Sequence, residues 1–208
     1  MRDKSSELEI EESDTIEKEK VLLNRSWSFW ENYEENSKDS KSYSESFEEI
    51  YTFDNIISFW QFWNKYRGND VREIFYNGEF IRYFFKRKLR ITSMNVFEKG
   101  IKPEWEDEKN KKGKILTLSY KIGNDLESFL SKVNELWVKL ILLLIGETIP
   151  YSNNINGIRF SDKTRLNKSI IFKFEVWVNK FMKEEELNEI KQYLFNIFGC
   201  EGTIKPMK

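Results

Sequence analysis

The feature that most constrains the fold is the long apolar periodicity of residues 126–145. Apolar side chains recur there every three or four positions, which predicts an amphipathic helix with one broad buried face; they are Leu126, Phe129, Leu130, Val133, Trp137, Leu140, Ile141 and Leu144. Asn124 or Asp125 can cap its start, and Gly146 stands where such a helix ends. The apolar run 136–149 is too short to span a bilayer. The helix must therefore pack against another layer of secondary structure.

Strand-like segments supply that layer. Short aromatic or alternating runs predict strands at residues 21–33, 47–51, 91–97, 115–121, 155–161 and 169–178, with a short edge strand at 203–205. Two further helices are predicted over 56–66, with Asp54 as N-cap, and over 183–198. The simplest layout is a single α+β domain, a curved antiparallel β-sheet backed by three α-helices, whose other face is free to bind a ligand.

The ends and the middle of this pattern are less regular. Residues 1–20 are charged and contain no aromatic side chain, which predicts a solvated tail preceding a domain over 21–208. A signal peptide is not expected, because these residues are not apolar. Within the domain, residues 67–93 are interpreted as an additional hairpin or helical excursion around Asn77-Gly78.

Composition excludes several kinds of site. The 208 residues include no histidine and one cysteine, so histidine-based nucleophile pairs, histidine-ligated zinc and an internal disulfide are impossible. A net charge of −1 gives no global attraction to nucleic acid, so any phosphate site must be a local patch. The 33 aromatic residues (7 Trp, 9 Tyr and 17 Phe) exceed the needs of a small core. Some of these rings should therefore serve a surface function.

The charged loop 102–110 carries the sharpest local signal. Trp105 offers a stacking face, and the adjacent Glu106 can accept two hydrogen bonds from the N1–H and N2 amine of guanine. A solvated loop with one anchoring tryptophan fits these residues equally well. The carboxylates of 104–108 could also hold a divalent ion, but four lysines follow them within the same loop and no glycine-centred calcium pattern exists, so no metal is expected.

Basic residues suggest where phosphates would bind. Lys163, Arg165 and Lys168 lie between two predicted strands, and together with Lys114 they could clasp a phosphate chain. From these residues alone, ordinary surface charge is the better interpretation. On the long helix, Val138 and Leu142 lie off the buried stripe, which indicates either a partner-facing surface or a helix buried on two sides.

Together these features resemble the eukaryotic translation initiation factor 4E family of mRNA cap-binding proteins, from about Leu22 to Phe198. Trp27-Ser28-Phe29-Trp30 resembles the family's first strand, and Phe53-Asp54 with Phe59-Trp60 and Asn64 its first helix. The segment 97–110 and Trp137 followed by residues 142–147 are the most specific matches. The resemblance implies a cap site on the concave side of the sheet.

The resemblance also implies roles for individual residues at the cap site. Trp105 and Tyr43 would sandwich the 7-methylguanine, with a cation–π contribution from the methylated base, and Glu106 would accept from the guanine edge. Phe172 would touch the methyl group. The cap phosphates would contact Lys114, Lys163, Arg165 and Lys168.

A second set of positions matches the family's scaffold-binding surface on the convex side. These positions are Ile56, Trp60, Val138, Lys139, Leu142 and Gly146, with Leu22 or Leu23 as additions. The implied partners are capped mRNA and a scaffold of the initiation factor 4G type or a 4E-binding regulatory peptide, which would dock a helix in a groove. Lys139 departs from the glutamate usual in the family.

The resulting hypothesis is a non-enzymatic factor that binds the mRNA cap and recruits the message to translation initiation, with no cofactor. It would be cytoplasmic or nuclear, not bound to a membrane, and a monomer outside its complexes. Three rivals remain: a cap-binding repressor that does not recruit the ribosome, a metal-dependent nucleotide hydrolase using the 104–108 carboxylates, and an interaction module without cap binding.

Overall fold

The computed structural model describes residues 22–35, 46–76, 89–122, 125–164, 170–200 and 202–207. Seven antiparallel strands form one sheet in the order β2-β1-β3-β5-β6-β4-β7. The strands are β1 (Leu22–Glu35), β2 (Phe47–Asn55), β3 (Leu89–Glu98), β4 (Lys114–Lys121), β5 (Ile155–Asp162), β6 (Ile171–Val178) and β7 (Gly202–Pro206). The predicted α+β class with an antiparallel sheet is confirmed, and every predicted strand is present.

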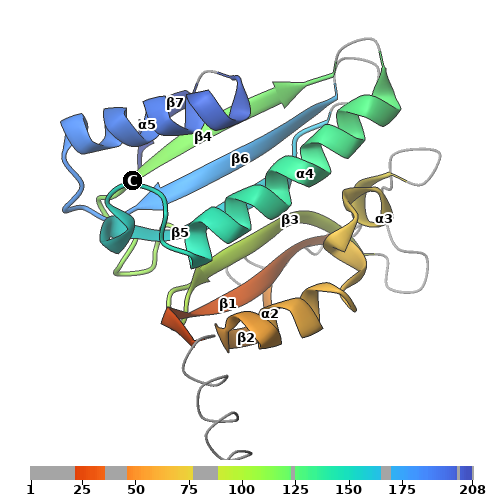
Figure 1. Cartoon of the computed structure of the whole chain (residues 1–208), viewed down its shortest axis with the longest axis horizontal. Coiled ribbons are helices and arrows are strands. Elements are labelled where there is room, and N and C mark those ends of the chain that lie inside the picture. Colours follow the sequence, from red (N-terminus) through yellow and green to blue (C-terminus); the bar gives the residue numbers. More distant parts are fainter. Residues whose placement is uncertain are drawn as a thin grey trace, which may run out of the picture.

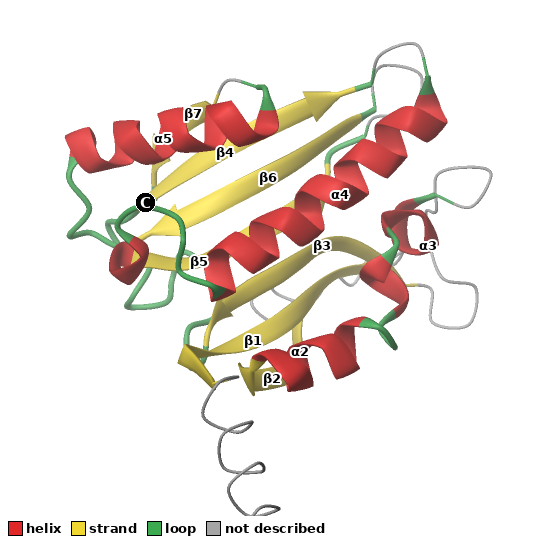
Figure 2. Cartoon of the chain, viewed as in Figure 1, coloured by secondary structure: helices red, strands yellow, loops and turns green. Residues whose placement is uncertain are grey.

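The α-helices lie on one face of the sheet, as Figure 1 and Figure 2 show. They are α2 (Ile56–Trp63), α3 (Val71–Phe75), α4 (Leu126–Ile145) and α5 (Glu184–Phe198), and two short 3-10 turns occupy Arg67–Asn69 and Ser152–Asn154. Three of these helices match the predicted ones. None of the helices in the described ranges is long and apolar enough to cross a membrane.

Strand alternation separates the two faces of the sheet. In β6, Phe172, Phe174 and Val176 are fully buried and belong to the main core under the helices. The side chains between them, such as Lys173 and Glu175, must point to the other side, because successive side chains of a strand alternate. We call this second side, opposite the helices, the open face.

Helix ends follow the expected capping rules, with one correction. Asp125 caps α4 by accepting from the backbone N–H of Glu127 at 3.1 Å, and Gly146 is its C-cap. The N-cap of α2 is Asn55, whose Oδ1 accepts from Ser58 N at 2.8 Å. The predicted cap Asp54 was therefore wrong by one residue, since both side chains are cap formers and only the backbone decides between them.

The irregular segment 67–93 contains the helix α3 and the first residues of β3. Val71, Ile74 and Phe75 are fully buried, which anchors α3 in the core. The Asn77-Gly78 turn lies outside the described residues, as does the predicted tail 1–20.

Candidate functional site

The β3–β4 connection, residues 99–113, carries Trp105 and Glu106. Trp105 is 46% exposed, whereas most of the other tryptophans are buried. Its indole N–H donates to the carboxylate of Glu106. The structure therefore brings together the two residues that the sequence predicted as stacking ring and guanine-edge acceptor.

Hydrogen bonds within the loop fix its shape. The Asp107 carboxylate accepts from the backbone N–H groups of Lys102 at 3.0 Å and Lys109 at 2.9 Å. The Asn110 side chain is fully buried, and its amide donates to the carbonyls of Lys102 and Glu104, both at 2.8 Å. These bonds close the loop around Trp105 before any ligand arrives, which reduces the ordering cost of binding.

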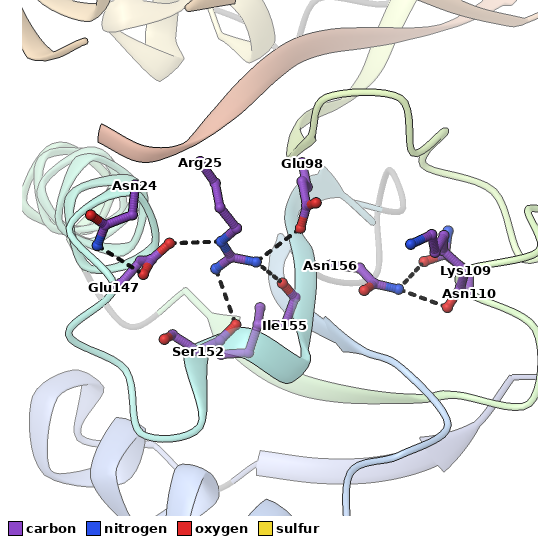
Figure 3. Close-up of polar contacts among 9 residues, drawn as sticks. All are labelled: Asn24, Arg25, Glu98, Lys109, Asn110, Glu147, Ser152, Ile155 and Asn156. Carbon is purple, nitrogen blue, oxygen red and sulfur yellow. Dashed lines mark hydrogen bonds and ion pairs between the residues drawn. The ribbon is translucent and has the colours of Figure 1, made fainter. Parts of the chain in front are cut away.

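A buried asparagine of β5 holds the far end of the loop. The Asn156 amide donates to the carbonyl of Lys109 and to Oδ1 of Asn110, both at 2.9 Å (Figure 3). At the near end, Ile101 packs into a small apolar cluster with Phe97, Trp177 and Met207. The loop is thus fastened to the sheet on both sides.

The 104–108 carboxylates do not converge on one point. Asp107 caps backbone N–H groups, Glu106 accepts from Trp105, and Glu108 pairs with Lys111. Among the residues that the structure describes, no group of three or more acidic or cysteine side chains could hold a metal ion. The hydrolase alternative, which needs these carboxylates together, gains no support from this geometry.

Lys163 follows β5, and its backbone N–H donates to Ile171 O at 2.9 Å. Although the residue is exposed, the protein around its ammonium lowers the pKa of Lys163 by desolvation. The neighbouring cations Arg159 and Lys173 lower it further, and Glu175 opposes them. Arg159, Lys173 and Glu175 alternate with fully buried residues of β5 and β6 and therefore belong to the open face. Arg165, Lys168 and Tyr43 lie outside the described residues.

Two residues assigned by resemblance lie elsewhere. Phe172 is fully buried and packs against Phe129, Phe160 and Phe75 beneath the helices, so its assignment to the methyl group was wrong. Lys114 pairs with Glu184 at the beginning of α5. It shares its face of β4 with the buried Leu116, so its assignment to the cap phosphates was also wrong.

The predicted partner positions lie on the helix-covered side. Trp60 of α2 is 36% exposed and Lys139 and Gly146 are exposed, whereas Ile56, Val138 and Leu142 are partly buried against the core. Two further apolar side chains, Leu22 and Ile57, are exposed on β1 and α2. α2 and α4 therefore offer apolar surface on the same side of the sheet (Figure 1).

Sequence reasoning missed Arg25, which joins four elements (Figure 3). Its guanidinium donates to Glu147 at 2.7 Å, to Glu98 at 3.0 Å, and to the carbonyls of Ile155 and Ser152 at 3.1 and 3.0 Å. It also lies over the Trp27 ring, 4.6 Å from the centroid. This contact set fixes the end of α4, where Gly146 lies. Asn156 and Arg159 were missed as well, because their partners are distant in sequence.

Comparisons with known proteins point to one family. The family model described as eukaryotic initiation factor 4E matches residues 22–205. Eukaryotic translation initiation factor 4E1 of Drosophila melanogaster is 29% identical over 167 residues, covering 79% of this chain and 52% of that protein. The corresponding Candida albicans factor is 28% identical over 138 residues, covering 65% and 56%. The chain thus spans a little over half the length of these curated relatives.

Solved structures share the fold. The complex of Ascaris suum eIF4E-3 with m7G cap has a TM-score of 0.66 at 19% identity, covering 90% of this chain and 91% of that chain. The complex of Caenorhabditis elegans eIF4E-3 with the 4E-binding protein Mextli has a TM-score of 0.63 at 18% identity, covering 86% of each.

Proposed function

The chain belongs to the eukaryotic initiation factor 4E family, and we propose from this premise that it binds the 7-methylguanosine cap of mRNA at the open face. The observation that carries the proposal is the fastened loop 102–110, which holds an exposed Trp105 ring beside Glu106. A half-exposed indole on a preorganised loop is a suitable stacking platform for a base.

The base chemistry follows from these two side chains. The methylated guanine carries a positive charge, so stacking on Trp105 gains a cation–π attraction that unmethylated guanine lacks. Glu106 would exchange its indole donor for the N1–H and N2 amine of the base, which form two charge-assisted hydrogen bonds. Tyr43 remains our candidate for the second wall of the sandwich.

The phosphate chain would extend toward the β5–β6 connection. Lys163 supplies one cation at the open face, and the following Arg165 and Lys168 remain candidates for further contacts. A triphosphate would also relieve the repulsion that Arg159 and Lys173 exert on Lys163. Binding of the cap should therefore depend on the number of phosphates and on salt.

We further propose that the exposed apolar surface of α2 and α4 binds a scaffold of the initiation factor 4G type or a 4E-binding peptide. Trp60 and Ile57 are large exposed apolar residues on a helix, which mark a docking surface for an amphipathic partner helix. Through such a scaffold the chain would recruit capped mRNA to translation initiation in the cytoplasm. It would sequester its ligand without chemistry.

A calorimetric titration tests cap binding. We expect 7-methyl-GTP to bind at least tenfold more tightly than GTP, which corresponds to about 1.4 kcal/mol. Trp105→Leu should abolish the difference, while Trp60→Leu, which alters the other side of the molecule, should preserve it. Equal affinity of the wild-type protein for the two nucleotides would refute the proposed function.

A further inference from the structure

Arg159 lies at the centre of the open face. Its neighbours Ile158 and Phe160 are fully buried in the core, so the alternation of β5 turns Arg159 to the opposite side. It stands directly between Asn95 of β3 and Glu175 of β6 in the strand register. No other strand position has a cation flanked in this way within the described part of the sheet.

The guanidinium is held in one plane by its surroundings. Nε donates to Asn95 Oδ1 at 2.7 Å, and Nη1 lies 3.8 Å from Glu175 Oε2. The group lies over the Trp177 ring, 4.5 Å from the centroid, and its side chain is only 11% exposed. Its charge is thus paired with a carboxylate, and its orientation is fixed by a flat aromatic surface.

The remaining arm of the guanidinium reaches the Trp105 loop. Nη2 donates to the backbone carbonyl of Pro103, two residues before Trp105. Pro103 is buried and its ring fixes the local backbone angle, so holding its carbonyl sets the direction in which the chain leaves the sheet. The Asp107 carboxylate and the Asn110 amide, which donates to the carbonyls of Lys102 and Glu104, close the loop on itself. Asn156 ties the far end of the loop to β5. Arg159 is therefore the strand side chain that holds the loop just before Trp105.

We propose that Arg159 is the positioning residue that orients Trp105 over the open face, and thereby determines the affinity of the base site. This inference rests on the proposed function and deepens it. Arg159 acts through the Pro103 carbonyl and need not touch the ligand. A lysine would keep the charge but could not hold Asn95 and Pro103 together, because an ammonium lacks the rigid fork of donors.

The test uses the full chain labelled with 5-fluorotryptophan and observed by fluorine NMR without ligand. Trp105→Phe and Trp137→Phe assign the two reporting resonances, one in the loop and one fully buried in the core. Arg159→Lys should shift or broaden the Trp105 resonance and leave that of Trp137 in place. Arg90→Lys is the matched control, because Arg90 is equally buried, at 12% side-chain exposure, and pairs with Asp162 of β5 without contacting the loop.

Calorimetry with 7-methyl-GTP completes the test. We expect Arg159→Lys to weaken binding about tenfold. In the fluorine NMR spectrum, Arg90→Lys should leave the Trp105 resonance unchanged. An unchanged Trp105 resonance in Arg159→Lys would overturn the positioning role, as would equal changes at Trp105 and Trp137. A displaced Trp105 resonance in a protein whose wild type binds no cap would support the positioning role while refuting the proposed function.

Discussion

Glu106 is the residue on which base recognition depends most directly. Its carboxylate accepts from the Trp105 indole in the free protein, so the acceptor is already aimed along the ring that would stack on the base. Loop residues of the same charge have different roles: Asp107 shapes the loop and Glu108 pairs with Lys111. Within this run of carboxylates, the position of each residue in the loop determines whether its side chain is available for the base or shapes the loop.

Glu106→Gln should weaken binding of 7-methyl-GTP by about 1–3 kcal/mol, because an amide cannot accept both donors of the guanine edge. Calorimetric titration measures the change. Glu108→Gln is the control and should leave affinity unchanged, since Glu108 is exposed and pairs only with Lys111 among the contacts described. Equal affinity of Glu106→Gln and wild type would exclude Glu106 as the reader.

Lys163 and Lys114 form a second matched pair at the residue scale. Lys163→Gln should cost ~0.5–1 kcal/mol for a triphosphate ligand and reduce the salt dependence of binding, as expected for an exposed ion pair. Lys114→Gln should change neither quantity, because Lys114 pairs with Glu184 on the helix-covered side. Titrations of mono-, di- and triphosphate cap analogues at two salt concentrations measure both quantities. An effect confined to Lys114→Gln would show that Lys114, and not Lys163, contacts the phosphates.

At the scale of elements, α2 carries two roles on opposite sides. Phe59 and Trp63 are buried against the sheet, whereas Ile57 and Trp60 face outward. Below α2, Glu31 of β1 is buried and accepts hydrogen bonds from the hydroxyls of Tyr33 and Tyr66. The hydrogen bond from Tyr66 to Glu31 therefore fastens the segment that follows α2 to β1.

Trp60→Ala should weaken binding of a scaffold-derived helical peptide by about 2 kcal/mol or more, as for an aromatic hot spot. Cap binding should remain as in wild type, because the open face lies on the other side of the sheet. Phe195→Ala, an exposed aromatic of α5, serves as the control. Peptide titration by anisotropy measures both; equal losses in the two variants would place the docking surface elsewhere.

Tyr66 predicts a pH dependence of stability. Its burial, and next the charge of Glu31 that it contacts, raise the pKa of Tyr66 well above its usual value of 10.0. The unfolded chain therefore loses the Tyr66 proton first, so the stability present below pH 10 falls as the pH rises above it, by about 1.4 kcal/mol per pH unit. Urea unfolding between pH 9 and 11.5 measures the slope.

Tyr66→Phe should lower stability near neutral pH, because Glu31 loses a donor, and should also flatten the alkaline slope. A slope identical to that of the wild-type protein would show that other tyrosines account for it.

At the scale of the whole molecule, Arg25 joins the beginning of β1 to the ends of α4, β3 and the turn before β5. Arg25→Lys should destabilise the protein by about 2 kcal/mol, because one ammonium cannot replace hydrogen bonds to two carboxylates and two carbonyls. Urea unfolding is the measurement. Arg72→Lys, which alters an exposed pair with Asp70, should cause no measurable change; equal stability of the two variants would contradict the bridging role.

The arrangement of strands and helices was accessible from the sequence, because alternation and helical periodicity are local. The same alternation could have corrected two site assignments. Lys173 and Glu175 alternate with Phe172, which indicates that Phe172 faces the core, and Lys114 shares the parity of the apolar Leu116. In both cases the alternation of the strand contradicts the role that the resemblance implies.

The hydrogen bonds that fasten the recognition loop to β5 could not be predicted from local sequence patterns. The bonds from Asn156 to Asn110 and from Arg159 to Pro103 span 46 and 56 positions and depend on the strand order, which no local pattern encodes. A buried asparagine in a strand indicates only that it must find a partner.

These long spans also bear on the timing of assembly. The recognition loop precedes β5 in the chain by roughly fifty residues, yet the side chains that fasten it come from β5. During synthesis, Trp105 therefore leaves the ribosome well before Asn156 and Arg159 can hold its loop. Contacts so distant in sequence form slowly, because the chain loses the entropy of loop closure before the contacts stabilise it. The nascent chain should thus be unable to engage a message until its central strand has emerged and paired.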